Sequence, residues 1–262
     1  MNPQTFIEVS LQFFAYAFLG WLWETLLAAF KRHKFVDTGF LVGPITPIYG
    51  FAVLSVLYLL RPWQQTWWLL FISATIVVTI LEYLTGSLLE RLFHTKWWNY
   101  EQVPLNIQGR VALPVSIFWG ICCVVIVKFV QPQVLRWVDV IGARFGLLLP
   151  VVLIAMMSFD LGFTLANLQS FRQRMEKLNL AIEERKGFLV TEADQVKHTL
   201  QENWEQRLHD NPKIAAHLSN LSYGQRRLLD SFPNMRVKNV TARVDEIKEL
   251  VTALKADSKR KK

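Results

Sequence analysis

Five long apolar runs constrain this chain more than any other feature of its sequence. A helix that crosses about 30 Å of hydrocarbon needs about 20 apolar residues, because every backbone N–H and C=O must be bonded within the segment. The second run carries Pro44 and Pro47, so its regular helix is expected to begin near Pro47. The pattern predicts an all-α membrane protein built around a bundle of about five transmembrane helices, in runs at about 9–30, 40–60, 67–89, 111–130 and 145–168.

Composition agrees with a membrane protein and divides the 262 residues into two parts. Mean hydropathy is +0.23, and 52% of residues are apolar, which disfavours a soluble globular protein. Residues 1–168 hold 10 Lys and Arg against 8 Asp and Glu, whereas residues 169–262 hold 19 against 13. We therefore expect two domains, a transmembrane bundle over 1–168 and a cytosolic helical region over 169–262 that ends in a basic tail. No nucleic-acid partner is expected.

The cytosolic region carries two amphipathic stripes. Apolar residues recur at positions 168, 171, 175, 178, 182, 189 and 196, and again at positions 240, 244, 247, 251 and 254. This three-and-four spacing is typical of a coiled-coil-like helix, and Phe232-Pro233 predicts a turn between the stripes. Two interpretations are open: a helical hairpin that packs on itself, or a surface for self-association or for a protein partner.

Short loops give the orientation of the bundle. The loops that follow the first and third runs, together with the segment after the fifth, hold nine Lys and Arg, whereas the opposite side holds four. Basic residues concentrate on the cytosolic side of a membrane. The sequence therefore predicts a multi-pass protein of the cell membrane with its N-terminus outside and its C-terminus in the cytosol.

Three acids stand inside the apolar runs, namely Glu24, Glu82 and Asp160. In the predicted topology Glu24 and Glu82 lie at similar depth, about 10–12 Å from the cytosolic interface. A charged residue at such a depth faces the bundle interior or water. One interpretation is a proton- or cation-binding cluster that Asp160 joins. The other is that each acid pairs with Arg110, His94 or an indole N–H and only fixes helix packing.

Two irregular segments on the cytosolic side are candidate loop sites. Residues 38–50 are rich in glycine and proline, so this backbone is expected to be non-helical at or near membrane depth, where it lines an ion or solute site or forms a tight interfacial turn. Residues 94–110 combine aromatic and polar side chains that form either a polar pocket or an aromatic belt. The candidate residues of the two segments are Gly43, Pro44, Pro47, Tyr49, His94, Trp97, Trp98, Asn99 and Tyr100.

Several chemistries are not expected. No GxxxxGK[ST] motif occurs, so the chain is not itself a P-loop ATPase. The histidines lack the spacing of a metal site, and the adjacent Cys122 and Cys123 form neither a CxxC motif nor a disulfide framework. No catalytic residues, metal or cofactor are predicted, and we do not expect an enzyme.

A set of short motifs resembles the CmpB family of ABC-type permeases, which itself resembles a group of small vertebrate transmembrane proteins. The motifs span residues 10–125, and Phe232-Pro233-Asn234-Met235-Arg236 is similar to a motif near the C-terminus of bacterial members. They are Gly20-Trp21, Trp23-Glu24, Thr38-Gly39-Phe40, Gly43-Pro44, Pro47-Ile48-Tyr49-Gly50, Leu81-Glu82-Tyr83, Thr85-Gly86, Phe93-His94-Thr95, Trp97-Trp98-Asn99-Tyr100, Asn106, Gly109-Arg110 and Phe118-Trp119-Gly120.

The resemblance implies a permease-like subunit of unknown substrate that works with a separate ATPase. Residues 169–262 are the expected docking region for an ATPase or another cytosolic protein, and the bundle is expected to contact the lipid bilayer and to be able to form homo-oligomers. The sequence shows no EAA-type coupling loop between the spans. The alternative function is therefore a non-transporting membrane scaffold or regulatory protein whose cytosolic helices bind partners.

Overall fold

The computed structural model describes residues 2–33, 35–193, 221–232 and 235–237. Helices dominate this part of the chain, and its strands are only two residues long. In chain order the elements are α1 (Pro3–Arg32), α2 (Pro47–Leu59), η1 (Arg61–Trp63), α3 (Trp67–Phe93), β1 (Thr95–Lys96), β2 (Asn106–Ile107), β3 (Val111–Ala112), α4 (Leu113–Val125), η2 (Ile126–Val130), α5 (Gln131–Phe145), α6 (Leu148–Ala193), α9 (Tyr223–Ser231) and β4 (Arg236–Val237).

Within the described residues four helices are long and apolar enough to cross a membrane, and α2 is a fifth, shorter apolar helix. The four segments are Pro3–Lys31, Trp67–Phe93, Leu113–Phe145 and Leu148–Leu180. The 13 residues of α2 rise only about 20 Å. Its helix begins at Pro47, as the sequence predicted, and the seven residues before Pro47 are non-helical. The prediction of an all-α membrane protein is confirmed.

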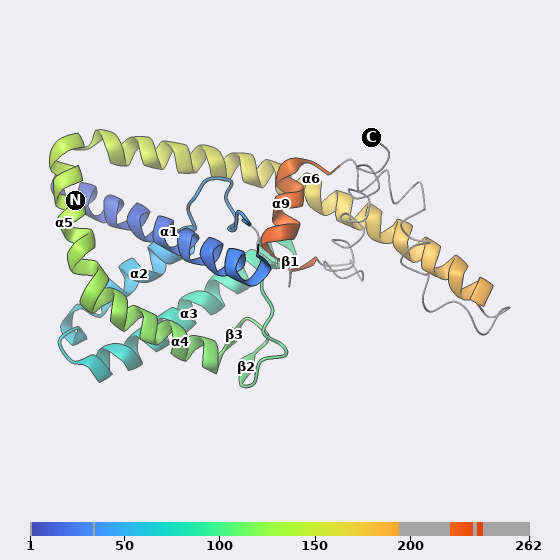
Figure 1. The fold of residues 1–262 in the computed structure, drawn as a ribbon, viewed down its shortest axis with the longest axis horizontal. Helices are drawn as coiled ribbons and strands as arrows, with labels where there is room; N and C mark the ends of the chain where they lie inside the picture. Colours follow the sequence, from blue (N-terminus) through green and yellow to red (C-terminus); the bar gives the residue numbers. More distant parts are fainter. Residues whose placement is uncertain (1, 34, 194–220, 233–234, 238–262) are drawn as a thin grey trace.

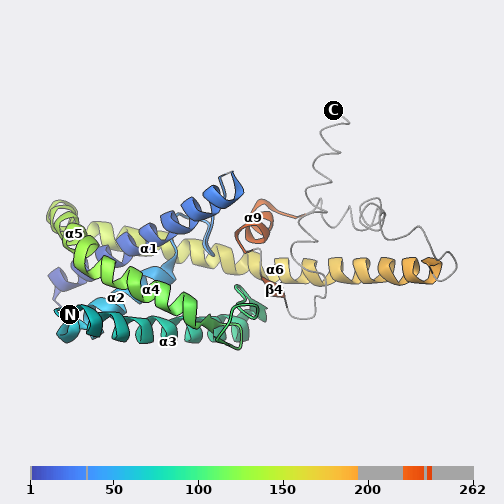
Figure 2. The ribbon, with the colours of Figure 1, turned by 60° about the horizontal axis from the view of Figure 1, so that its bottom comes forward.

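The long helices run back and forth along one axis, so the bundle has two ends (Figure 1). One end holds the N-terminus, η1 and α5, and α5 crosses it at a steep angle to α6 (Figures 1 and 2). The other end, called the loop end below, holds the end of α1, residues 94–112 and α9, whereas the segment before α2 turns back along the bundle until Thr46 N–H donates to the Ala17 carbonyl in the middle of α1 (Figure 1). Both loops that the sequence predicts to be cytosolic therefore begin at the loop end.

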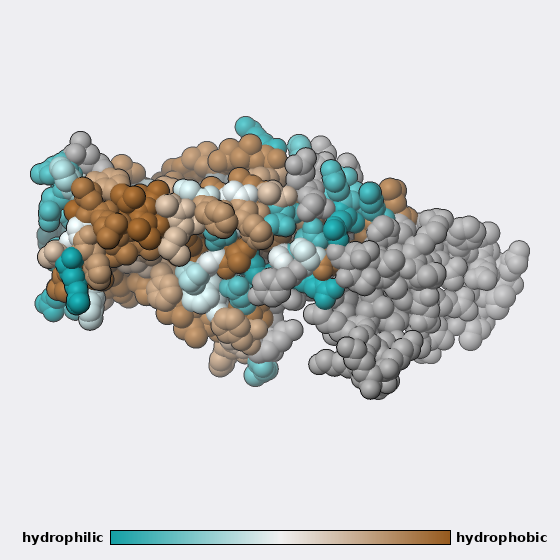
Figure 3. All heavy atoms as spheres, turned by 90° about the horizontal axis from the view of Figure 1, so that it is seen from above, coloured by the Kyte–Doolittle hydropathy of each residue, from teal (hydrophilic) through white to brown (hydrophobic). Residues whose placement is uncertain are grey.

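The bundle core lies between α1, α2, α3 and α4, where Ala17, Val56, Leu70 and Ala74 are fully or almost fully buried. Glycine lets α1 and α2 approach closely, since a Cβ on Gly50 would lie 2.6 Å from the ring of Phe13. Many large apolar side chains stay exposed on the outer faces, and Figure 3 shows them between hydrophilic residues at the two ends. This distribution is the one expected of a surface that faces lipid.

The fourth predicted span continues beyond its expected end. The sequence predicted a span to Val130 followed by a loop, but η2 and α5 extend the helix to Phe145. Pro132 would clash with the carbonyl four residues earlier in a regular α-helix. The five-residue π-turn η2 widens the backbone there, and Gln131 N–H donates to the carbonyl of Ile126. The π-turn therefore accommodates Pro132, and the helix continues through it.

The tail begins inside a helix, because α6 runs without interruption through residue 168. The first stripe residues Leu168, Phe171, Met175 and Leu178 are buried against α9 and Trp97. The remaining positions of this stripe, and the whole second stripe, lie outside the described side chains. α9 ends at Ser231, at the predicted turn, and β4 pairs antiparallel with β1. A coiled coil and the division into two domains at residue 168 remain predictions.

Candidate functional site

Glu24 of α1 is held by α2. The Tyr49 hydroxyl donates to Glu24 Oε1 over 2.9 Å. The Tyr49 ring lies directly over Gly20, one turn before Glu24, and a Cβ at Gly20 would overlap it. The Trp119 ring of α4 packs edge-on against Tyr49, with 5.5 Å between ring centroids. Three helices therefore position this carboxylate inside the bundle.

Glu82 of α3 is held by the loop between β1 and β2. The Tyr100 hydroxyl donates to Glu82 Oε1 over 3.1 Å. Glu82 Oε2 is buried and has no hydrogen-bond partner among the described residues. A buried carboxylate oxygen without a partner is costly, and a proton or a cation would relieve that cost.

Tyr100 is hydrogen-bonded to Glu82 and is also within electrostatic range of Glu24. Burial raises the pKa of its phenol above the usual range, and the nearby charges of Glu82 and Glu24 raise that pKa further. The phenol therefore stays protonated and available as a hydrogen-bond donor at neutral pH. Glu82 thus acts on this phenol through a hydrogen bond and Glu24 through its charge, and we call these four residues (Glu24, Tyr49, Glu82 and Tyr100) the carboxylate pair with its two tyrosines.

Asp160 has different partners. Its two carboxylate oxygens accept from the backbone N–H groups of Val42, at 3.0 Å, and Gly43, at 2.7 Å. Thr164 donates to the same carboxylate one turn later in α6. Asp160 therefore satisfies two donors of the non-helical segment before α2, and its contacts are those of a residue that fixes backbone.

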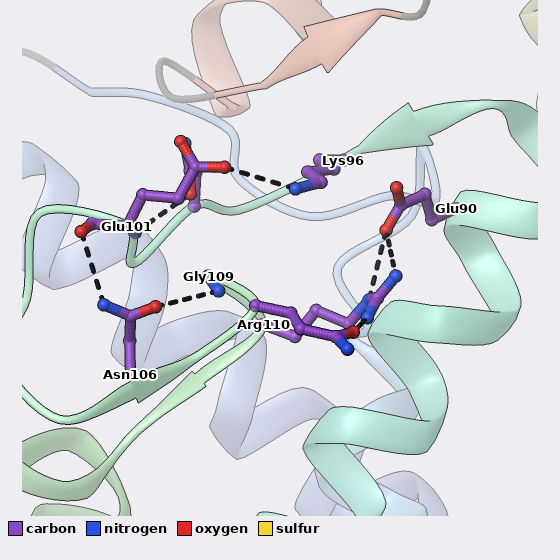
Figure 4. Close-up of polar contacts among 8 residues, drawn as sticks. Glu90, Lys96, Glu101, Asn106, Gly109 and Arg110 are labelled. Atoms are coloured by element: carbon purple, nitrogen blue, oxygen red, sulfur yellow. Dashed lines mark hydrogen bonds and ion pairs between the residues drawn. The ribbon is translucent and has the colours of Figure 1, made fainter.

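Arg110 pairs with Glu90 and not with an acid of the carboxylate pair. Its guanidinium nitrogens reach Glu90 Oε2 at 2.8 and 3.1 Å, and it lies 5.4 Å from the centre of the Tyr83 ring (Figure 4). The Trp98 indole N–H donates to the Arg110 carbonyl over 2.8 Å. These contacts shape the loop that carries Tyr100.

The other candidate residues shape the two loops. The Asn99 side-chain oxygen accepts from the backbone N–H of Glu101 over 3.0 Å, which fixes the turn between them. His94 is exposed and ends α3 in the left-handed region. Trp97 is 4% exposed and belongs to an apolar cluster with α6 and α9. Pro44 follows Gly43 in the loop, and Pro47 opens α2.

Two groups of residues were missed at the sequence level. Along α1, Glu8, Gln12 and Tyr16 follow one another at a spacing of four residues and form a hydrogen-bonded network with Gln131 of α5. Their spacing of four in an apolar helix is a signal that could have shown this polar row. Arg227 contacts the loop at Gly39, and nothing distinguishes it from the other basic residues of the tail.

A family model matches residues 11–165, which are more than half of the chain and include Glu24, Tyr49, Glu82, Tyr100 and Asp160. No curated protein and no solved structure gives a significant match. The match includes at least part of every transmembrane candidate helix: it begins within α1 and ends within α6, before α9 and β4. The chain therefore belongs to the CmpB family of membrane proteins, which is described as "Putative ABC-transporter type IV".

Proposed function

We propose that this chain is a permease subunit of an ABC-type transporter that works with a separate ATPase. Glu24 and Glu82 form its interior site, which takes a proton, a small cation or a cationic group of the substrate. The family match supports the transporter class. The observation that carries the site is the buried Glu82 Oε2, which lacks a partner among the described residues, while the charge of Glu24 acts on the Tyr100 phenol that holds Glu82.

A purely structural role explains this arrangement less well. Asp160 illustrates that role, because both of its oxygens accept hydrogen bonds from backbone. Glu82 instead uses one oxygen, and its other oxygen is buried without a partner in the part of the chain that the structure describes. An acid kept only for packing would be expected to have both oxygens satisfied. A site that takes up and releases a proton or a cation needs a free carboxylate oxygen.

Affinity purification of the tagged full chain from its native membrane, followed by mass spectrometry, tests the partner. We expect an ATP-binding-cassette ATPase in the complex. Recovery of envelope or cytoskeletal proteins without an ATPase would support the scaffold alternative and contradict the permease.

ATP hydrolysis by the purified complex tests the site. Glu82→Gln keeps hydrogen-bonding capacity and volume but removes the titrating charge, so the complex should assemble and hydrolyse ATP at an altered rate. Asp139→Asn is the matched control, because Asp139 is exposed on α5. Equal rates for the native chain, Glu82→Gln and Asp139→Asn would contradict a role of Glu82 in transport.

A further inference from the structure

A short C-terminal segment packs on the loop end of the bundle. It comprises residues 221–232 and 235–237, contains α9 and β4, and is called the clasp below. Figures 1 and 2 place α9 beside α6 at the loop end. The clasp lies outside the residues that the family model matches, so the family match assigns it no role.

Arg227 binds the first loop through its backbone. This side chain is 6% exposed, and its two terminal nitrogens donate to the carbonyls of Gly39, at 3.1 Å, and Phe40, at 3.0 Å. It also lies 4.0 Å from Asp37 Oδ2, while the Ser231 hydroxyl donates to the Asp37 carbonyl over 2.8 Å. Charged hydrogen bonds to buried carbonyls are stronger than neutral ones, so Arg227 is the main polar anchor.

The clasp binds the second loop through a strand and a ring. β4 pairs with β1, with Thr95 opposite Val237 and Lys96 opposite Arg236. Phe232 packs edge-on against Trp97, with 4.9 Å between centroids, and Trp97 contacts Phe40 of the first loop in the same way at 5.1 Å. One segment therefore holds both loops.

The second loop carries Tyr100, and the first loop ends where α2 begins, two residues before Tyr49. The first loop is fixed by Arg227 through its carbonyls and by Asp160 through its N–H groups, and it leads directly into α2 and Tyr49. The second loop carries Tyr100 four residues after β1. Any movement of the clasp therefore acts on both donors that hold Glu24 and Glu82.

The clasp is suited to dock and release as a unit. α9 has nine residues, and isolated helices of that length are only marginally stable in water. Its order must come from the surface on which it packs, through Leu228 and Leu229, which are buried, and through Arg227. A segment of this kind has two states, docked and released.

We propose that the clasp is a conformational latch. When docked, it keeps Tyr49 and Tyr100 on their carboxylates. When released, it frees both loops together and opens the carboxylate pair to water at the loop end. The regulatory meaning of this latch rests on the proposed function of the pair.

Hydrogen–deuterium exchange of the full chain in lipid nanodiscs tests the latch. Arg227→Ala should speed exchange in residues 38–46 and residues 95–101 by at least about tenfold, and by a similar factor in both loops, because one opening event exposes them. Lys177→Ala removes an exposed cation of α6 and should leave both loops unchanged. Faster exchange in α9 with unchanged loops would overturn the proposal.

Two milder variants keep the test decisive if Arg227→Ala does not fold. Ser231→Ala removes only the hydrogen bond to the Asp37 carbonyl and should speed exchange in both loops by a smaller factor. The second variant carries Thr95→Cys and Val237→Cys in a chain with Cys122 and Cys123 replaced by alanine. A disulfide between these two positions joins opposite residues of β1 and β4 and should slow hydrogen–deuterium exchange in both loops. Unchanged loops in both variants would reject the latch.

The exchange measurement does not depend on transport. Exchange could rise together in both loops while the Glu82→Gln variant hydrolyses ATP at the native rate. This pair of results would support the latch and contradict the proposed function. Unchanged exchange in the loops together with an altered rate of ATP hydrolysis in Glu82→Gln would contradict the latch and support the proposed function.

Discussion

At the scale of single residues, the interior acids divide by how their oxygens are used. Asp160 is satisfied by backbone donors, whereas Glu82 has one buried oxygen without a partner among the residues described. Counting residues along the helices predicts a common depth for Glu24 and Glu82, and that depth stays a prediction. The sequence could not assign Tyr49 and Tyr100 as their partners, because those contacts depend on how two loops fold.

Tyr100→Phe tests the hydrogen bond to Glu82. The variant removes the only donor that the described residues give to this carboxylate, so we expect a loss of about 1–3 kcal/mol in the free energy of unfolding. Tyr83→Phe is the control, since the Tyr83 hydroxyl makes an exposed contact with Gln108. Thermal unfolding in nanodiscs compares the two. Equal stability of both variants would contradict the buried hydrogen bond.

Gly20→Ala tests the packing that places Tyr49. The new methyl group would overlap the Tyr49 ring, and overpacking of this kind costs about 1–3 kcal/mol. Gly162→Ala on α6 is the matched control, because a Cβ there meets no atom within 4 Å. Thermal unfolding should show a lower midpoint temperature for Gly20→Ala and an unchanged one for Gly162→Ala. A native midpoint temperature for Gly20→Ala would contradict the close approach of the Tyr49 ring to Gly20.

At the scale of elements, hydrophobic pattern and proline predicted where helices begin better than where they end. The start of α2 at Pro47 follows from the missing N–H of proline, which is tolerated in the first turn. The helix of the fourth run continues past its predicted end at residue 130, because the π-turn η2 accommodates the Pro132 ring inside a continuous helix. The burial of Leu168, Phe171, Met175 and Leu178 follows the predicted stripe, but its partner, α9, lies about 50 residues away in the chain.

At the scale of the whole molecule, the basic loops gather at one end. The end of α1, where the first loop begins, and residues 94–112 lie with α9 at the loop end, opposite the N-terminus (Figure 1). The predicted topology puts these loops on the same side of the membrane, and their grouping at one end agrees with it. That this side is the cytosolic one remains a prediction from the basic residues.

Cysteine labelling in intact cells tests that topology. In a chain with Cys122 and Cys123 replaced by alanine, a single cysteine at position 5 should react with a membrane-impermeant maleimide, and one at position 200 should react only after lysis. Labelling of position 200 from outside would reverse the orientation.

The central claim is that Glu24 and Glu82 form a functional interior site, and a hydrophobic carbodiimide tests it most directly. This reagent modifies carboxyl groups that take up a proton in apolar surroundings, and mass spectrometry locates the product. We expect modification of Glu82, absent in Glu82→Gln, and little at Asp160, whose oxygens both accept backbone hydrogen bonds. Added sodium or a higher pH should slow it, because a bound cation or loss of the proton protects the carboxylate. Equal modification of Glu82 and Asp160, or a Glu82 that never reacts, would contradict the account.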